Sequence, residues 1–126
     1  MKKKLATIAL AVGLLAVAGF AEAGTAYTNY NTTVGKFNGS GYTSYHTKAS
    51  SGKYGNLRST SVGGSYTVDA RMQASSGTGA WVRSVNSNQV RNLPNSVSKG
   101  NRARVQFSND LTTPVNVQVT GSWRSN

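Results

Sequence analysis

The side chains best suited to chemistry in this chain are arginines placed among aromatic residues. Arg71, Arg102 and Arg104 each alternate with apolar residues in short runs. Arg83 lies two positions after Trp81. A guanidinium group offers a planar fork of N–H donors that fits phosphate or carboxylate oxygens. An aromatic ring can stack on a sugar or lie at a membrane interface. These residue types predict anion binding.

The predicted anion- and envelope-binding residues lie in the central and C-terminal runs of the chain, together with one tyrosine from the N-terminal third. We hypothesise that Arg124 shares a sheet face with three of these arginines, at positions 71, 102 and 104. The alternative is that the arginines are spread over two faces, because the alternation does not reveal which strands are neighbours. The candidates are Arg71, Arg83, Arg102, Arg104, Trp81 and Tyr42.

Few side chains could act as general acids or bases. The chain has no cysteine and one histidine, His46, which we expect at the surface. Asp69 lies mid-strand and is expected to form a surface ion pair, whereas Asp110 is expected to be a turn residue. A glycosidase needs a carboxylate pair, and a zinc site needs three or four ligands. We therefore expect that the protein is not an enzyme and that it has no cofactor and no metal site.

The first 23 residues have the pattern of a cleaved signal peptide. Three lysines, at positions 2–4, precede an apolar run from Leu5 to Phe20, and Ala21-Glu22-Ala23 is a small-residue cleavage site. The apolar run is shorter than the roughly 20 residues of a membrane span. We expect Gly24 to begin the mature protein, which would then be a secreted, extracellular bacterial protein of one domain, residues 24–126.

The charge of the expected mature chain is strongly unbalanced. Residues 24–126 hold eleven basic side chains and two carboxylates, a formal charge of about +9. Such a field attracts polyanions, although it could serve only solubility. The expected partners outside a cell are anionic cell-wall polymers or lipid-linked wall precursors, with contact at a membrane surface. No motif for reading nucleic acid is present. The oligomeric state is left open.

Short alternating runs separated by Gly, Ser, Asn and Pro predict an all-β fold. No stretch repeats apolar residues with helical periodicity. We expect a small antiparallel β-sandwich of about six to eight strands, with residues 86–101 mostly loop. The strands are expected near 25–37, 41–48, 57–61, 65–73, 80–85, 102–108 and 115–123.

Alternation within these strands also predicts the core. Leu57, Leu93 and Leu111 are expected to close its ends. The remaining predicted core residues are Tyr66, Val68, Ala70, Met72, Val82, Ala103, Val105, Phe107, Val115, Val117, Val119 and Trp123.

The chain resembles small secreted Gram-positive proteins encoded with bacteriocin systems, including lactococcin-type bacteriocins that bind lipid II. The shared features are the signal, the absence of cysteine, the start Gly24-Thr25-Ala26-Tyr27, segments such as "GYTSYHTKASSG" and a last strand that ends in Trp123. Here the chain continues as "RSN", and no functional residue carries over. The resemblance implies a secreted, bacteriocin-like protein.

Two functions therefore follow from the sequence. The first is a secreted, basic, non-catalytic protein that binds at a bacterial cell envelope and acts in a bacteriocin-like, antimicrobial way. The alternative is a structural or self-assembling protein of the extracellular matrix or cell surface. Its N-terminal strands, which carry few charges, would suit pairing at strand edges.

Overall fold

The computed structural model describes residues 22–126. Most of the predicted signal peptide, residues 1–23, lies outside the described residues. The described residues form ten strands and no helix, and thus contain no helix able to span a bilayer. The strands are β2 (Glu22–Ala23), β3 (Thr28–Val34), β4 (Ser40–Tyr42), β5 (His46–Thr47), β6 (Gly55–Val62), β7 (Val68–Ala74), β8 (Val82–Val85), β9 (Gln89–Leu93), β10 (Arg102–Asn109) and β11 (Val117–Arg124).

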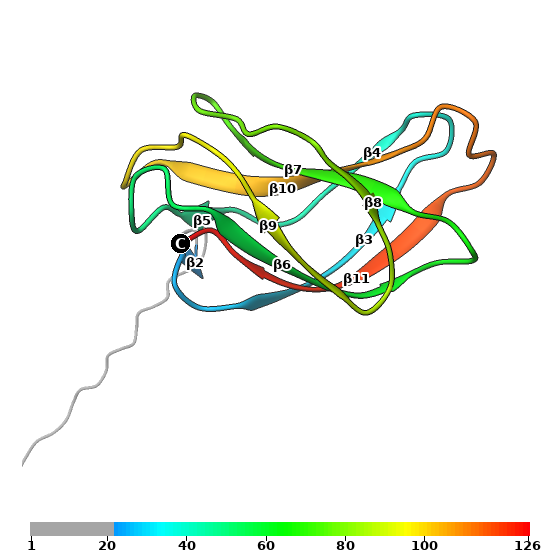
Figure 1. Cartoon of the computed structure of the whole chain (residues 1–126), viewed down its shortest axis with the longest axis horizontal. Coiled ribbons are helices and arrows are strands. Elements are labelled where there is room, and N and C mark those ends of the chain that lie inside the picture. The colour runs from blue at the N-terminus through cyan, green and yellow to red at the C-terminus, as the bar shows by residue number, and fades with distance from the viewer. Residues whose placement is uncertain (1–21) are drawn as a thin grey trace, which may run out of the picture.

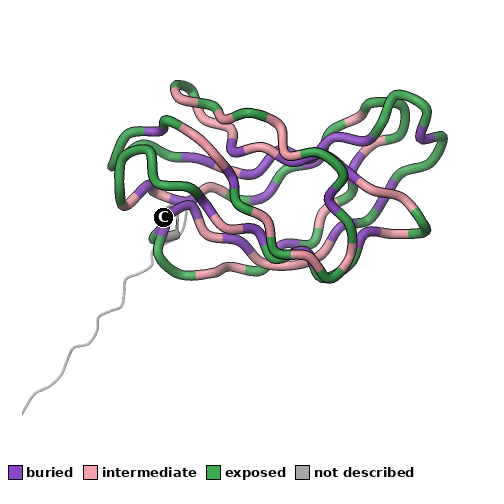
Figure 2. The backbone as a smooth tube through the Cα atoms, in the orientation of Figure 1, coloured by how far each residue is buried: buried purple, intermediate pink, exposed green. Residues whose placement is uncertain are grey.

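The strands form two sheets that face each other (Figure 1). One has the order β2-β5-β10-β7-β8, with β4 also paired to β10, and the other has the order β3-β11-β6-β9. All pairs are antiparallel except β2 with β5. The loops at both ends of the sandwich are mainly exposed, whereas buried segments recur along the strands (Figure 2). The predicted fold class is confirmed; six to eight strands were expected, and seven of the ten strands are four residues or longer.

The core lies between the sheets and follows the predicted alternation. Met72, Val105 and Phe107 of one sheet are fully buried, as are Leu57 and Trp123 of the other. Each large apolar side chain buried in this way contributes about 1.5–3 kcal/mol. Among the predicted core residues, the structure buries Leu57, Val68, Ala70, Met72, Leu93, Ala103, Val105, Phe107, Val117, Val119 and Trp123.

The predicted burial is wrong for two of the predicted core residues. Leu111 is 73% exposed and Val115 is 44% exposed. Both lie in the loop before β11, which begins at Val117 and not at residue 115. Tyr66 and Val82 are only partly buried against the core. The core instead includes Tyr30, Val34, Val62, Val85 and Val97.

The predicted loop at residues 86–101 contains a strand. β9 pairs with β6 from Gly55↔Leu93 to Ser59↔Gln89. It is an edge strand, and only Leu93 of its five residues is buried, while Val90 is 69% exposed. A strand that buries so little has almost no hydrophobic alternation, and its sequence therefore resembles a loop.

His46 and Lys48 are both buried, and for His46 this corrects the predicted surface position. The His46 ring stacks on Trp123 with centroids 4.0 Å apart. Its Nε2 lies 2.6 Å from Thr28 Oγ1, and Ser125 N–H donates to its Nδ1 at 3.3 Å. Lys48 Nζ donates to two backbone carbonyls, one of them that of Ser125 at 2.8 Å. Both groups therefore hold the C-terminal segment in place.

Candidate functional site

The outer face of the larger sheet brings together the predicted arginines of β7 and β10. Because side chains alternate across a strand, the burial of Ala70, Met72, Val105 and Phe107 turns their neighbours outward. The register places Arg71 opposite Gln106 and Arg104 opposite Gln73. These four outward side chains form a two-by-two arginine–glutamine checkerboard.

Each arginine of the checkerboard is held by the amide opposite it. Arg71 Nε donates to Gln106 Oε1 at 2.8 Å, and Arg104 Nε donates to Gln73 Oε1 at 2.7 Å. Gln106 in turn donates from Nε2 to Ser40 Oγ at 3.2 Å. A neutral amide orients a guanidinium without cancelling its charge. Within the described part of the chain, the terminal nitrogens of both arginines have no carboxylate partner.

Aromatic rings lie against the guanidinium groups of these arginines. The Arg104 guanidinium lies 3.9 Å from the Tyr42 ring centroid and 5.0 Å from that of Tyr45. Arg71 lies 4.5 Å from the Trp81 ring centroid. Strand pairing explains the position of Tyr42, because β4 places it opposite Gln106 on β10. Cation–π contacts of this kind contribute about 0.5–1 kcal/mol at exposed sites.

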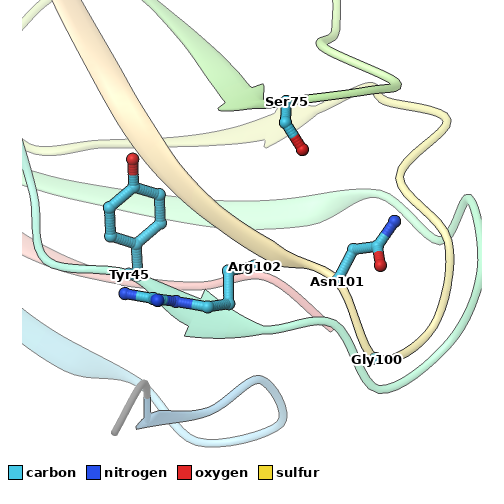
Figure 3. A pocket seen from close by; sticks show the side chains of 5 residues that line it. All are labelled: Tyr45, Ser75, Gly100, Asn101 and Arg102. Carbon is cyan, nitrogen blue, oxygen red and sulfur yellow. The ribbon is translucent and has the colours of Figure 1, made fainter. Parts of the chain in front are cut away.

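Arg102 extends the same face. It is exposed and lies 4.7 Å from the Tyr45 ring centroid. Next to it is an open hollow of about 410 Å³, lined also by Ser75, Gly100 and Asn101. Figure 3 shows the Arg102 guanidinium beside the Tyr45 ring, with Asn101 and Ser75 across the hollow. The hollow therefore combines a cation, a ring and neutral polar groups.

Arg83 differs from the other predicted arginines because its charge is paired. It forms an ion pair with Asp69 at 2.6 Å, the single salt bridge among the described side chains. The register of β7 and β8 shifts between Val68 and Ala70, and Ser84 has a positive φ of 58°. This irregularity lets Ser84 N–H donate to the second Asp69 oxygen at 3.1 Å. Asp69 is thus an ion-pair partner, as predicted, but it is buried.

All six predicted site residues lie on or beside this face, and Tyr45 joins them. We call the set the basic plate. Arg124, in contrast, lies on β11 of the other sheet, so the hypothesis that four arginines share one face is wrong for it. The basic plate consists of Arg71, Arg83, Arg102, Arg104, Tyr42, Tyr45 and Trp81.

The basic plate carries cations and rings, and the carboxylate next to it, Asp69, is already paired with Arg83. Among the described residues, no group of three or more His, Cys, Asp and Glu side chains could hold a metal ion. Burial lowers the pKa of His46 to about 4, and the ring lies inside the sandwich. The arrangement is suited to binding phosphate or carboxylate groups next to a sugar or lipid headgroup.

Comparison with protein-family models, curated proteins and solved structures finds no match. The resemblance to lactococcin-type bacteriocins therefore stays a prediction, as do secretion and the absence of catalysis. The protein is thus a small basic β-sandwich with oriented arginines on the outer face of its larger sheet.

Proposed function

We propose that the chain is a secreted, non-catalytic protein that binds anionic polymers or lipid-linked precursors of a bacterial cell envelope through the basic plate. The observation that carries this proposal is the checkerboard of Arg71, Gln73, Arg104 and Gln106. Arginines that served only solubility would need no orienting partner. Here two of them are fixed by amides and covered by rings, with their charge retained.

The binding mechanism has two stages. The net positive charge first attracts a polyanion and raises the rate of encounter, an effect that salt screens over about 10 Å at 0.1 M. The terminal nitrogens of Arg71 and Arg104 then donate to phosphate or carboxylate oxygens. Their Nε atoms are already engaged, and little side-chain entropy remains to be lost on binding. Tyr42, Tyr45 and Trp81 contact the adjoining sugar or headgroup.

The bacteriocin-like part of this proposal is a separate step. It is supported by the resemblance of the chain to secreted bacteriocin-like proteins and by a charge suited to anionic envelopes. Binding to a wall polymer does not require growth inhibition, so the two properties need separate measurements.

The test is co-sedimentation of the purified protein with intact Gram-positive cells at low and high salt, followed by plating of the same cells. We expect binding at low salt that high salt reverses, together with loss of viable cells. Binding without growth loss would remove the antibacterial step and leave an envelope-binding protein. Absence of binding at low salt would overturn the proposed function.

Self-assembly is the second candidate, and one observation favours it. β3, residues Thr28–Val34, is an edge strand without a charged residue or proline. Such edges can pair with another chain. Sedimentation that rises with protein concentration in the absence of cells would support assembly over envelope binding.

A further inference from the structure

A second arginine cluster lies on the opposite side of the sandwich. The Tyr27 ring has the Arg58 guanidinium 3.7 Å from its centroid and the Arg124 guanidinium 4.6 Å from it. Arg58 and Arg124 belong to β6 and β11 of the smaller sheet. Their outward direction follows from the burial of Leu57 and Trp123, which alternate with them.

The cluster repeats the construction of the checkerboard. Arg124 lies opposite Asn56 in the strand register, and its Nε donates to Asn56 Oδ1 at 2.8 Å. Asn56 is itself held by Asn92, whose Oδ1 accepts from Asn56 Nδ2 at 3.1 Å. We call Tyr27, Arg58, Arg124 and Asn56 the Tyr27 clamp. An arginine fixed by a cross-strand amide and covered by a ring thus occurs on both sheets.

The Tyr27 clamp is charged, but the strand face around it is neutral. The outward residues farther along β3, β6 and β11 carry amides and hydroxyls that hydrogen-bond to one another. Thr33 donates to Gln118 at 2.8 Å, and Ser61 lies 2.8 Å from Thr120. Neither arginine of the clamp has a carboxylate partner among the described side chains. The positive charge of these strands is therefore concentrated at one point.

We propose that the Tyr27 clamp is a second anion site and that one molecule bridges two phosphodiester polymer chains, one on each side of the sandwich. This inference rests on the proposed function of the basic plate. Two sheets packed face to face direct their outer sides away from each other (Figure 1). A polymer chain bound to the basic plate therefore leaves the Tyr27 clamp open to another chain. Bridging would cross-link an anionic surface layer, an effect that binding through one site does not produce.

The experiment uses beads coated with poly(glycerol phosphate) and measures two quantities, the fraction of protein bound and the agglutination of the beads. The wild-type protein is expected to bind and to agglutinate. R58Q/R124Q removes the Tyr27 clamp, and R71Q/R104Q removes the same charge from the basic plate. K36Q/R91Q is the charge-matched control, because Lys36 lies beside Phe37, Arg91 donates to Ser84 and Gln89, and neither belongs to the two sites.

We expect R58Q/R124Q to lower the agglutination titre by about tenfold or more while the bound fraction falls by about threefold or less. R71Q/R104Q should also abolish agglutination, and the control should retain it. An equal mixture of the two site variants should remain inactive, because bridging needs both sites on one molecule. Should R58Q/R124Q fail to fold, R58Q alone serves, since Arg58 is exposed.

Two results overturn the inference. The first is agglutination by R58Q/R124Q at the wild-type titre, which would mean that the clamp is not used. The second is agglutination restored by the mixture, which would mean that bridging occurs through oligomers with one site each. Wild-type protein that does not bind the beads would instead overturn the proposed function itself.

Discussion

Gln106 on β10 lies directly opposite Arg71 on β7, and its Oε1 accepts a 2.8 Å hydrogen bond from Arg71 Nε. In the neighbouring pair the arginine, Arg104, is on β10 and the glutamine, Gln73, is on β7. The same contact, from Arg104 Nε to Gln73 Oε1, is 2.7 Å long. The amides fix the positions of the two cations, and the free charge remains available to a ligand. The proposed binding of anions requires arginines that are oriented but not neutralised.

The checkerboard predicts a specific effect of replacing its amides by carboxylates. Q73E/Q106E preserves the shape of both side chains and the oxygen that accepts from each arginine. The new carboxylates cancel the charges of Arg71 and Arg104. We expect binding to an anionic polymer to fall by about a hundredfold, equivalent to about 2.7 kcal/mol. The thermal unfolding midpoint should stay the same or rise, because each hydrogen bond becomes charge-assisted.

The matched control for this prediction is Q89E/Q118E. It adds the same two negative charges on β9 and β11, in the smaller sheet. If both double variants weaken binding equally, net charge and not the checkerboard governs affinity.

Trp81 should report ligand binding through its contact with Arg71. Polymer phosphate that engages the guanidinium 4.5 Å from the ring centroid should change the indole fluorescence. W81F should abolish that change, because Trp123 is fully buried in the core. Affinity should fall by about threefold or less, since phenylalanine retains part of the cation–π contact. A signal that persists in W81F would place the ligand elsewhere.

His46 predicts that stability falls in acid. Its Nδ1 accepts from Ser125 N–H, so the neutral ring donates from Nε2 to Thr28 Oγ1. Burial lowers the pKa from 6.5 to about 4, and between these values the unfolded chain binds the extra proton. The contribution of neutral His46 to the free energy of unfolding is therefore complete above pH 6.5 and is lost as the pH falls to about 4. The loss is about 3 kcal/mol.

Urea denaturation of wild-type protein and H46Q across this pH range measures the effect. H46Q should be less stable at neutral pH but should lack the extra decline, while other acidic transitions remain common to both proteins. Parallel pH profiles would show that His46 does not titrate as its burial implies.

At Gly121, next to Arg58 of the Tyr27 clamp, the packing leaves no room for a side chain. A register shift lies between Thr120 and Gly121 on β11. An added Cβ at Gly121 would overlap the Arg58 carbonyl oxygen and lie 2.7 Å from the Tyr30 hydroxyl. G121A should therefore destabilise the fold by about 1–3 kcal/mol, the usual effect of overpacking.

G63A is the control for this substitution, because its Cβ would meet no atom closer than 3.4 Å. Urea denaturation should separate the two variants clearly. Equal stability of G121A and the wild type would mean that β11 can shift away from β6 at little cost.

The alternation of residues was enough to predict the sandwich and the outward direction of Arg71, Arg102 and Arg104. It could not reveal strand neighbours, and for that reason Gln73 and Gln106 were missed and Arg124 was assigned to the wrong sheet. Glutamine in an outward position carries no signal until a register places it opposite an arginine. Tyr45 was missed as well, because it lies just before β5, whose pairing with β10 could not be inferred from the sequence.

His46 and Lys48 show a different limit of sequence reading. Polar residues in a segment rich in Tyr, Ser and Thr are normally exposed. Their burial is compensated mainly by the Thr28 side chain and the Ser125 backbone, which are distant in the chain. Those partners can be identified only from the fold, and His46 was therefore predicted at the surface.

The central claim is that the arginines of the checkerboard, and not net charge alone, bind the polyanion. Its most direct test is the salt dependence of affinity for poly(glycerol phosphate), compared between R71Q/R104Q and the charge-matched K36Q/R91Q. We predict that R71Q/R104Q binds about a hundredfold more weakly and that its affinity falls less steeply with salt, while K36Q/R91Q stays within about threefold of the wild type. Equal losses in the two variants would contradict the account and leave the charge as a non-specific attraction.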